Sequence, residues 1–167
     1  MRSVIFGIKF LRYKLFSKHR KGFGVHSPFL YDFVINVLYS KSFYYAFDDL
    51  NQLRAQLLNS DETIRVIDLG AGSKKMNTAE RKISEIVRFC AVKRKFGEMI
   101  FRLVGKFKPN TILELGTSLG LGTSYIAKAN PQAEISTIEG CPKTALRAGE
   151  NFRLLNLNNI HQKIGNI

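Results

Sequence analysis

The chain has 167 residues, of which 45% are hydrophobic and 23% charged, which suits one domain with a buried core. Its 26 basic and 13 acidic residues give a net charge of +13, so it would attract nucleic acid or anionic lipid without specifying either. No segment approaches the ~18 apolar residues of a transmembrane helix. Two cysteines without a secretory signal are expected to be reduced, in a cytoplasmic protein.

The N-terminal segment combines helical periodicity with positive charge, and residues 4–16 are predicted to form an amphipathic helix. The repeating apolar positions are Val4, Ile5, Ile8, Leu11 and Leu15. The basic residues that precede any acid are Arg2, Lys9, Arg12, Lys14, Lys18, Arg20 and Lys21. Such a helix could lie on a membrane surface or attract nucleic acid. The simpler interpretation is a solvated helix whose charge is balanced by sequence C-terminal to this chain.

Two further helices are expected before residue 60. Ser27 is a plausible N-cap with Pro28 at the first helical position. His26 stands beside this cap and is expected to make local hydrogen bonds rather than to act chemically. A second helix is predicted to begin at Asp48 or Asp49 and to end at Leu58.

Residues 66–73, VIDLGAGS, contain a first glycine-rich pattern, with Asp68, Gly70 and Gly72 after an expected strand at 64–69. A nucleoside-binding unit would continue with a second strand that ends in an acid. A helix is expected here instead, capped by Asn77 with Glu80 three residues on and with Ile83, Ile86, Val87 and Cys90 on its buried face. We therefore interpret the pattern as a turn in an accessory region or as a second loop covering a cofactor.

The second glycine-rich pattern is more complete. A helix is expected over 95–107, with Phe96, Met99, Ile100, Leu103, Val104 and Phe107 on its apolar face, and Pro109 and Asn110 should end it. A strand then leads to a turn with Gly116, Gly120 and Gly122, a helix, and a second strand that stops at Glu139. Backbone N–H groups at such a turn meet a polar ligand, and the terminal acid holds ribose hydroxyls.

A dinucleotide cofactor does not suit this turn. The dinucleotide fingerprint is G-x-G-x-x-G, in which the second glycine leaves room for a pyrophosphate. Counted from Gly116, Ser118 occupies the second place, and counted from Gly120, Tyr125 occupies the third. NAD and FAD are therefore disfavoured.

The spacing E-x-G-x-S-x-G resembles the first motif of class I S-adenosylmethionine-dependent methyltransferases. The O-methyltransferase-like subset, with ILEIGT-x-x-G-x-S, is most similar, although Gly122 stands where its last serine would be. Residues 95–104 resemble the lead-in helix of that subset. The phrase G-x-G-x-H-S-P-F from Gly22 resembles an N-terminal extension in a Bacteroidetes-type group of bacterial methyltransferases.

The resemblance implies a Rossmann-like α/β fold and S-adenosyl-L-methionine as cofactor. It implies that a methyl group passes to an unidentified oxygen or nitrogen acceptor, such as a small molecule, and it names no catalytic residue. Residues lining the methionine side would be Glu114, Gly116, Thr117, Ser118 and Gly120, with Glu139 on the ribose and Gly140 beside it. Cys141 would form a pocket wall and Cys90 part of the core. The spacing of His19, His26 and His161 suggests no metal site.

The family fold has a seven-stranded, mostly parallel sheet, of which this chain supplies about three strands. A helix is expected over 142–157, and 160–167 should begin the third strand. We expect a helical extension over 1–92 and an incomplete cofactor-binding domain over 93–167. A truncated chain should be marginally stable or self-associate, because parallel sheets bury both faces. The alternative is a non-catalytic fragment or a basic module that binds nucleic acid or a membrane surface.

Overall fold

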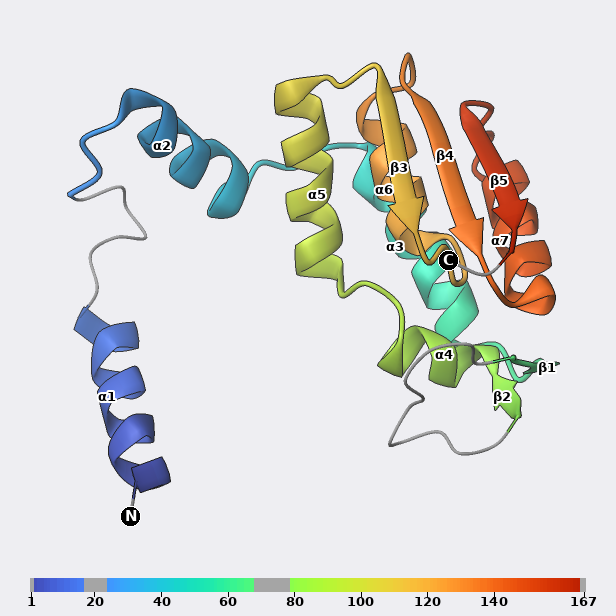
Figure 1. Cartoon of the computed structure of the whole chain (residues 1–167), viewed down its shortest axis with the longest axis horizontal. Coiled ribbons are helices and arrows are strands. Elements are labelled where there is room, and N and C mark those ends of the chain that lie inside the picture. Colours follow the sequence, from blue (N-terminus) through green and yellow to red (C-terminus); the bar gives the residue numbers. More distant parts are fainter. Residues whose placement is uncertain (1, 17–23, 68–78, 166–167) are drawn as a thin grey trace. The chain divides into compact units, whose positions relative to one another are not determined.

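The chain forms two compact units, residues 1–42 and 43–167, in a computed structural model that describes residues 2–16, 24–67 and 79–165 (Figure 1). The second unit contains helices and a three-stranded parallel sheet, so the predicted α/β fold class is confirmed. No helix within the described ranges is both long enough and apolar enough to cross a membrane.

The first unit contains the predicted N-terminal helices. Helix α1 runs from Arg2 to Phe16. Helix α2, Pro28–Phe33, begins as expected, because Ser27 Oγ accepts a hydrogen bond from Leu30 N at 3.4 Å and Pro28 follows the cap. A π-helical turn, η2 (Val34–Leu38), continues α2. His26 is exposed beside the cap, and its role stays a prediction.

The parallel sheet of the second unit is built from β3 (Thr111–Leu115), β4 (Glu134–Glu139) and β5 (Ile160–Ile164), in that order. Helix α6 (Leu121–Ala129) connects β3 to β4, and α7 (Pro142–Leu154) connects β4 to β5. Successive right-handed crossovers in one direction put both helices on the same face. Figure 1 shows the three strands in front of α6 and α7.

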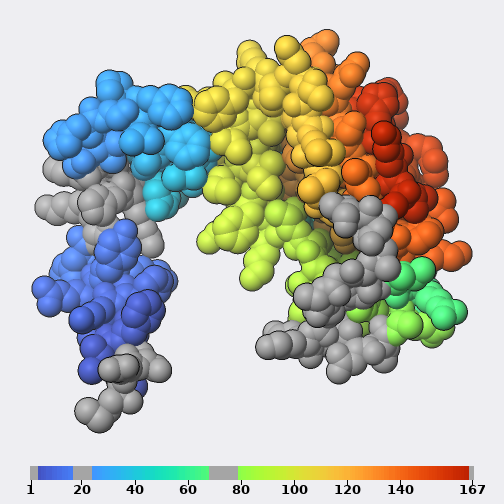
Figure 2. All heavy atoms as spheres, viewed as in Figure 1, coloured from blue at the N-terminus to red at the C-terminus, as the bar shows by residue number. Residues whose placement is uncertain are grey.

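The register of the strands decides which residues face the helices. Ile112, Ile135 and Ile160 lie side by side and pack against helix α5 (Arg94–Phe107) and α6. Leu113 and Leu115 alternate to the other face, where they are 64% and 56% exposed. In the space-filling view, β3 to β5 (yellow to red) have no described helix in front of them (Figure 2).

The buried face of α5 differs from the predicted one. Phe96 and Phe107 are exposed, whereas Phe101 and Gly97 are buried. A Cβ atom at Gly97 would lie 2.3 Å from the ring of the fully buried Tyr125 on α6. The absence of a side chain at position 97 therefore lets α5 and α6 pack closely.

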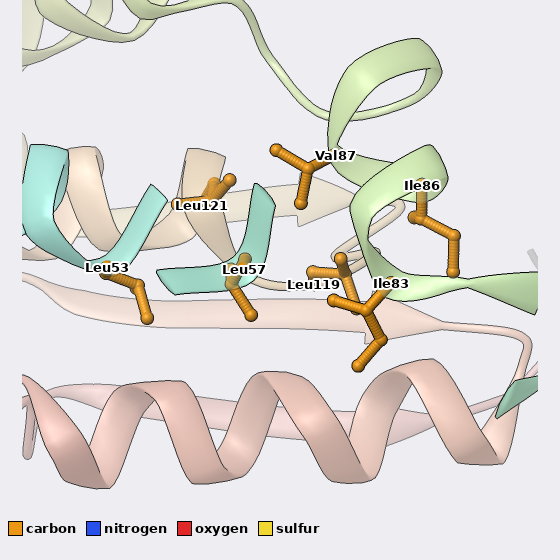
Figure 3. Packing of buried hydrophobic residues seen from close by; sticks show 7 residues of the cluster. All are labelled: Leu53, Leu57, Ile83, Ile86, Val87, Leu119 and Leu121. Atoms are coloured by element: carbon orange, nitrogen blue, oxygen red, sulfur yellow. The ribbon is translucent and has the colours of Figure 1, made fainter. Parts of the chain in front are cut away.

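Residues 43–92 pack into the same compact unit as the sheet. They form α3 (Ala46–Leu58), β1 (Thr63–Arg65), β2 (Glu80–Lys82) and α4 (Ile83–Phe89). Leucines of α3 and aliphatic residues of α4 meet the start of α6 in one apolar cluster (Figure 3). Its buried members are Leu53, Leu57, Ile83, Ile86, Val87, Leu119 and Leu121. The functional division of the chain at residue 92 stays a prediction.

Two expectations for this region were wrong. Glu80 lies in β2, paired with Arg65 of β1, so it cannot be the third residue of a helix that begins only at Ile83. Cys90 is exposed, because the helix ends at Phe89 and the cysteine turns away from the buried face. Asn77, the predicted cap, lies outside the described residues.

Candidate nucleoside-binding site

The turn after β3 is folded over the carboxyl end of β4. Gly116 N and Thr117 N donate hydrogen bonds to Ile138 O at 2.9 and 3.3 Å. Gly116 adopts φ +90°, Ser118 φ +49° and Gly120 φ +79°. A Cβ at Gly116 would have no atom within 4 Å, so the backbone of this residue borders open space. Here the turn can approach a ligand closely.

Glu139 ends β4, and its carboxylate bridges two loops. Its Oε2 accepts a hydrogen bond from Ser118 N at 2.6 Å, and its Oε1 accepts one from Cys141 N at 2.9 Å. The structure therefore brings together the acid and the turn that the sequence pattern paired. Each carboxylate oxygen keeps a further lone pair with which to accept a hydrogen bond.

Glu114 lies on the covered face of the sheet, inside a hydroxyl network. Thr123 Oγ1 donates a hydrogen bond to Glu114 Oε2, and Thr137 Oγ1 donates to the same oxygen at 2.9 Å. Thr117 Oγ1 lies 2.6 Å from Thr137 Oγ1. Burial raises the pKa of Glu114 above its ordinary value, although the two threonine hydrogen bonds oppose this. The network joins β3, β4 and the start of α6.

The network also explains Gly122. A Cβ at this position would lie 2.9 Å from Glu114 Oε1. Gly122, the glycine that departs from the methyltransferase-like motif, therefore leaves space for a carboxylate beneath it.

The back of the turn rests on α7. A Cβ at Gly120 would lie 2.5 Å from the ring of Phe152, and Asn151 Nδ2 donates to Leu119 O at 2.9 Å. Ser124 Oγ donates to Gly120 O at 2.7 Å. Gly120 thus packs against α7, whereas Gly116 borders open space.

Cys141 connects this site to the first glycine-rich segment. Its buried Sγ accepts a hydrogen bond from Ile67 N at 3.4 Å and lies 3.7 Å from Arg65 O. Burial acts to raise the pKa of the thiol, but hydrogen bonds from Thr144, Ile67 and the Lys143 backbone outweigh it and lower the pKa. Sequence reasoning missed this contact, because no local pattern links residues 74 positions apart.

Asp68, Gly70 and Gly72 of the first glycine-rich segment lie outside the described residues. A strand does follow it, contrary to expectation, but β2 pairs antiparallel with β1. Residues 63–82 are therefore not a parallel strand–helix–strand unit, which supports excluding them as the main cofactor turn. Both remaining interpretations, an accessory turn and a covering loop, stay open.

A pocket with a volume of about 620 Å³ lies away from this turn. It is lined by Lys128, Pro131 and residues 155–159, close to the starts of β4 and β5. Ligands of parallel α/β sheets bind at the carboxyl ends of the strands, so this pocket is at the wrong end. No metal-binding cluster of His, Cys, Asp and Glu occurs within the described ranges.

No protein-family model and no curated protein matches the chain. It is similar to the crystal structure of an O-methyltransferase from Bacillus cereus with SAH, at 20% identity over 75% of this chain and 46% of that one (TM-score 0.48). It is also similar to the O-methyltransferase TomG from Streptomyces achromogenes with SAM, at 26% identity over 46% of this chain and 35% of that one (TM-score 0.44). The SAH-bound methyltransferase PaMTH1 from Podospora anserina matches at 18% identity over 76% and 44% (TM-score 0.48).

The chain spans less than half the length of each of these three proteins. With TM-scores below 0.5, these similarities assign neither a fold nor an activity to it. The fold is evident from its own strands and helices, and the ligand has to be argued from the contacts of Glu139 and the turn.

Proposed function

We propose that this chain provides the adenosyl-binding half of an S-adenosylmethionine-dependent methyltransferase. The observation that carries the proposal is the hydrogen bond between the Glu139 carboxylate and Ser118 N. It places an acid with free lone pairs beside an open glycine turn at the carboxyl ends of two parallel strands. A ribose diol can donate to both carboxylate oxygens.

The same contact argues against a phosphate-containing ligand. A pyrophosphate binds to exposed backbone N–H groups at such a turn. Here Glu139 already occupies Ser118 N, and its negative charge would repel a phosphate. S-adenosylmethionine carries no phosphate and has positive groups, so the electrostatics of the turn suit it.

The individual roles follow from the geometry. Gly116, Ser118, Glu139 and Gly140 would contact the cofactor from the turn and the end of β4. Glu114, Thr117 and Gly120 have internal partners and would hold the turn in shape. When bound, the cofactor supplies an electrophilic methyl group, which an acceptor oxygen or nitrogen takes up as it loses its proton, leaving S-adenosylhomocysteine.

Methyl transfer by the whole protein is a wider proposal than cofactor binding. No described residue is assigned as the base that would take the acceptor's proton, and the acceptor itself is unidentified. Truncation, a cytoplasmic location, membership of the Bacteroidetes-type group and the division at residue 92 also remain predictions.

Isothermal titration of the full chain with S-adenosylhomocysteine and, separately, with NAD tests the proposal. We expect heat only with S-adenosylhomocysteine. Glu139→Gln should weaken binding roughly tenfold or more, since a hydrogen bond to a charged group contributes about 1.5–3 kcal/mol. The matched control is Glu134→Gln, an exposed acid at the other end of the same strand, which should bind normally. Binding of NAD, or no heat from protein with normal circular dichroism, would refute the proposal.

A further inference from the structure

Helix α1 exposes far more apolar surface than a solvated helix needs. Between Val4 and Phe16, nine large apolar or aromatic side chains are 50–76% exposed. They are Val4, Ile5, Phe6, Ile8, Phe10, Leu11, Tyr13, Leu15 and Phe16. Contiguous exposed apolar surface on this scale marks an interaction site.

The charges around these residues restrict the partner. Lys9, Arg12 and Lys14 on α1 are exposed, and the sequence has no acid before Asp32. A second copy of α1 would bring like charges together, which opposes pairing through this helix. The helix therefore complements a surface that is both apolar and negatively charged.

We propose that α1 lies in the interface of an anionic phospholipid bilayer. Val4, Ile8, Leu11 and Leu15 recur at helical spacing, and the face that they form would enter the boundary of the acyl chains. The long stems of Lys9 and Lys14 can run along the apolar surface while their charges reach the lipid phosphates. Fifteen residues span about 22 Å, too short for a hydrocarbon core of about 30 Å, so the helix would lie along the surface.

A nucleic acid partner fits these observations less well. Phosphate binding would use the basic residues but would leave the aliphatic residues of α1 in water. A lipid interface accounts for the aliphatic and the basic residues together.

The chain contains no tryptophan, so a single introduced tryptophan reports on its own surroundings. In Leu11→Trp, which places the probe on the inserted face, we expect the fluorescence to shift to the blue with phosphatidylcholine vesicles that contain phosphatidylserine, and the protein to sediment with them. The matched control is Tyr45→Trp, because Tyr45 is 88% exposed in the other compact unit and should show no shift.

Two sets of substitutions separate the contributions of charge and apolar surface. Neutralising Lys9, Arg12 and Lys14 to glutamine should weaken vesicle binding by roughly a hundredfold, at about fivefold for each charge near an anionic surface. Ile8→Ser with Leu11→Ser should weaken it by roughly tenfold or more, and should do so in high salt as well. Both variants should bind S-adenosylhomocysteine as the unmodified chain does, so this test is independent of the proposed function.

Three outcomes would overturn the proposal. The Leu11→Trp emission could stay unchanged with anionic vesicles. It could shift with protein concentration alone, which would indicate self-association through α1. The protein could also bind RNA with a steep dependence on salt while leaving vesicles unbound.

Discussion

The two faces of the parallel sheet are made of alternate residues of the same strands, yet within residues 43–67 and 79–165 only one face is covered. Ile112, Ile135 and Ile160 form a row beneath α5 and α6, whereas Leu113 and its neighbours face outward. Both connecting helices fall on one side because the strands follow one another in a single direction. Parallel sheets bury both faces, so we predict that residues outside the described ranges or a second copy of the chain cover the open one.

The largest expected difference lies between Ile135→Ala and Leu113→Ala. Ile135 is fully buried, and its truncation should lower the free energy of unfolding by about 2–5 kcal/mol. Leu113 is largely exposed, so the same change should alter the free energy by less than about 0.5 kcal/mol. Urea denaturation followed by circular dichroism measures both.

Protein concentration is the control for this comparison. A large loss of stability in Leu113→Ala that disappears on dilution would mean that a second copy covers the open face. A sharp, reversible and concentration-independent transition of the unmodified chain would contradict the predicted self-association.

The turn shows the same contrast between a covered side and an open one. Gly120→Ala places a methyl group against the Phe152 ring in a left-handed backbone, and should cost about 2–4 kcal/mol. Gly116→Ala meets no atom and should cost only the backbone strain, about 1–2 kcal/mol. Thermal denaturation compares the stability of the two variants. Equal losses of stability would show that the Phe152 ring moves aside at little cost in free energy. If the turn binds the cofactor, Gly116→Ala should lose more affinity for S-adenosylhomocysteine than its stability loss suggests.

The smallest expected effect is a dependence on pH. The folded chain raises the pKa of Glu114 above its ordinary value of 4.5, so the folded state holds that proton more tightly than the unfolded state. The resulting stabilisation is present when the pH is below the ordinary pKa, and it is lost as the pH rises through the raised pKa of the folded state. Glu114→Gln has no such proton to lose. Its free energy of unfolding relative to that of the unmodified chain should therefore increase as the pH rises from the ordinary pKa to the raised one.

Urea denaturation of Glu114→Gln at several pH values measures this difference. Glu134→Gln, which removes an exposed carboxylate from the same sheet, controls for the change in net charge. A difference between Glu114→Gln and the unmodified chain that is independent of pH would contradict the raised pKa.

Local patterns predicted most of the elements, because capping and termination signals act within a few residues. Ser27 and Pro28 begin a helix, and the chain leaves α5 at Lys108, just before Pro109 and Asn110. The strand that ends at Glu139 was also predicted correctly. These features depend on backbone chemistry that is visible in the sequence.

The failures depended on tertiary contacts. Glu80 belongs to a strand because Arg65 pairs with it across a long connection, and no helical pattern reveals that partner. Apolar bulk suggested that Phe96 would be buried, whereas Gly97 is the residue that meets Tyr125. In the candidate site, the pairing of Glu114 with Thr137 follows from the parallel register, which local spacing does not fix.

The hydrogen bonds among the threonine hydroxyls beneath the turn run in one direction. While Glu114 is ionised, Thr137 commits its only proton to that carboxylate, so the 2.6 Å contact requires Thr117 to donate to Thr137. Thr117 then has only lone pairs left for any other group, so a group that contacts its hydroxyl would have to donate the hydrogen bond. The ionisation of Glu114 therefore sets the direction in which the hydrogen bonds run from the turn into the sheet.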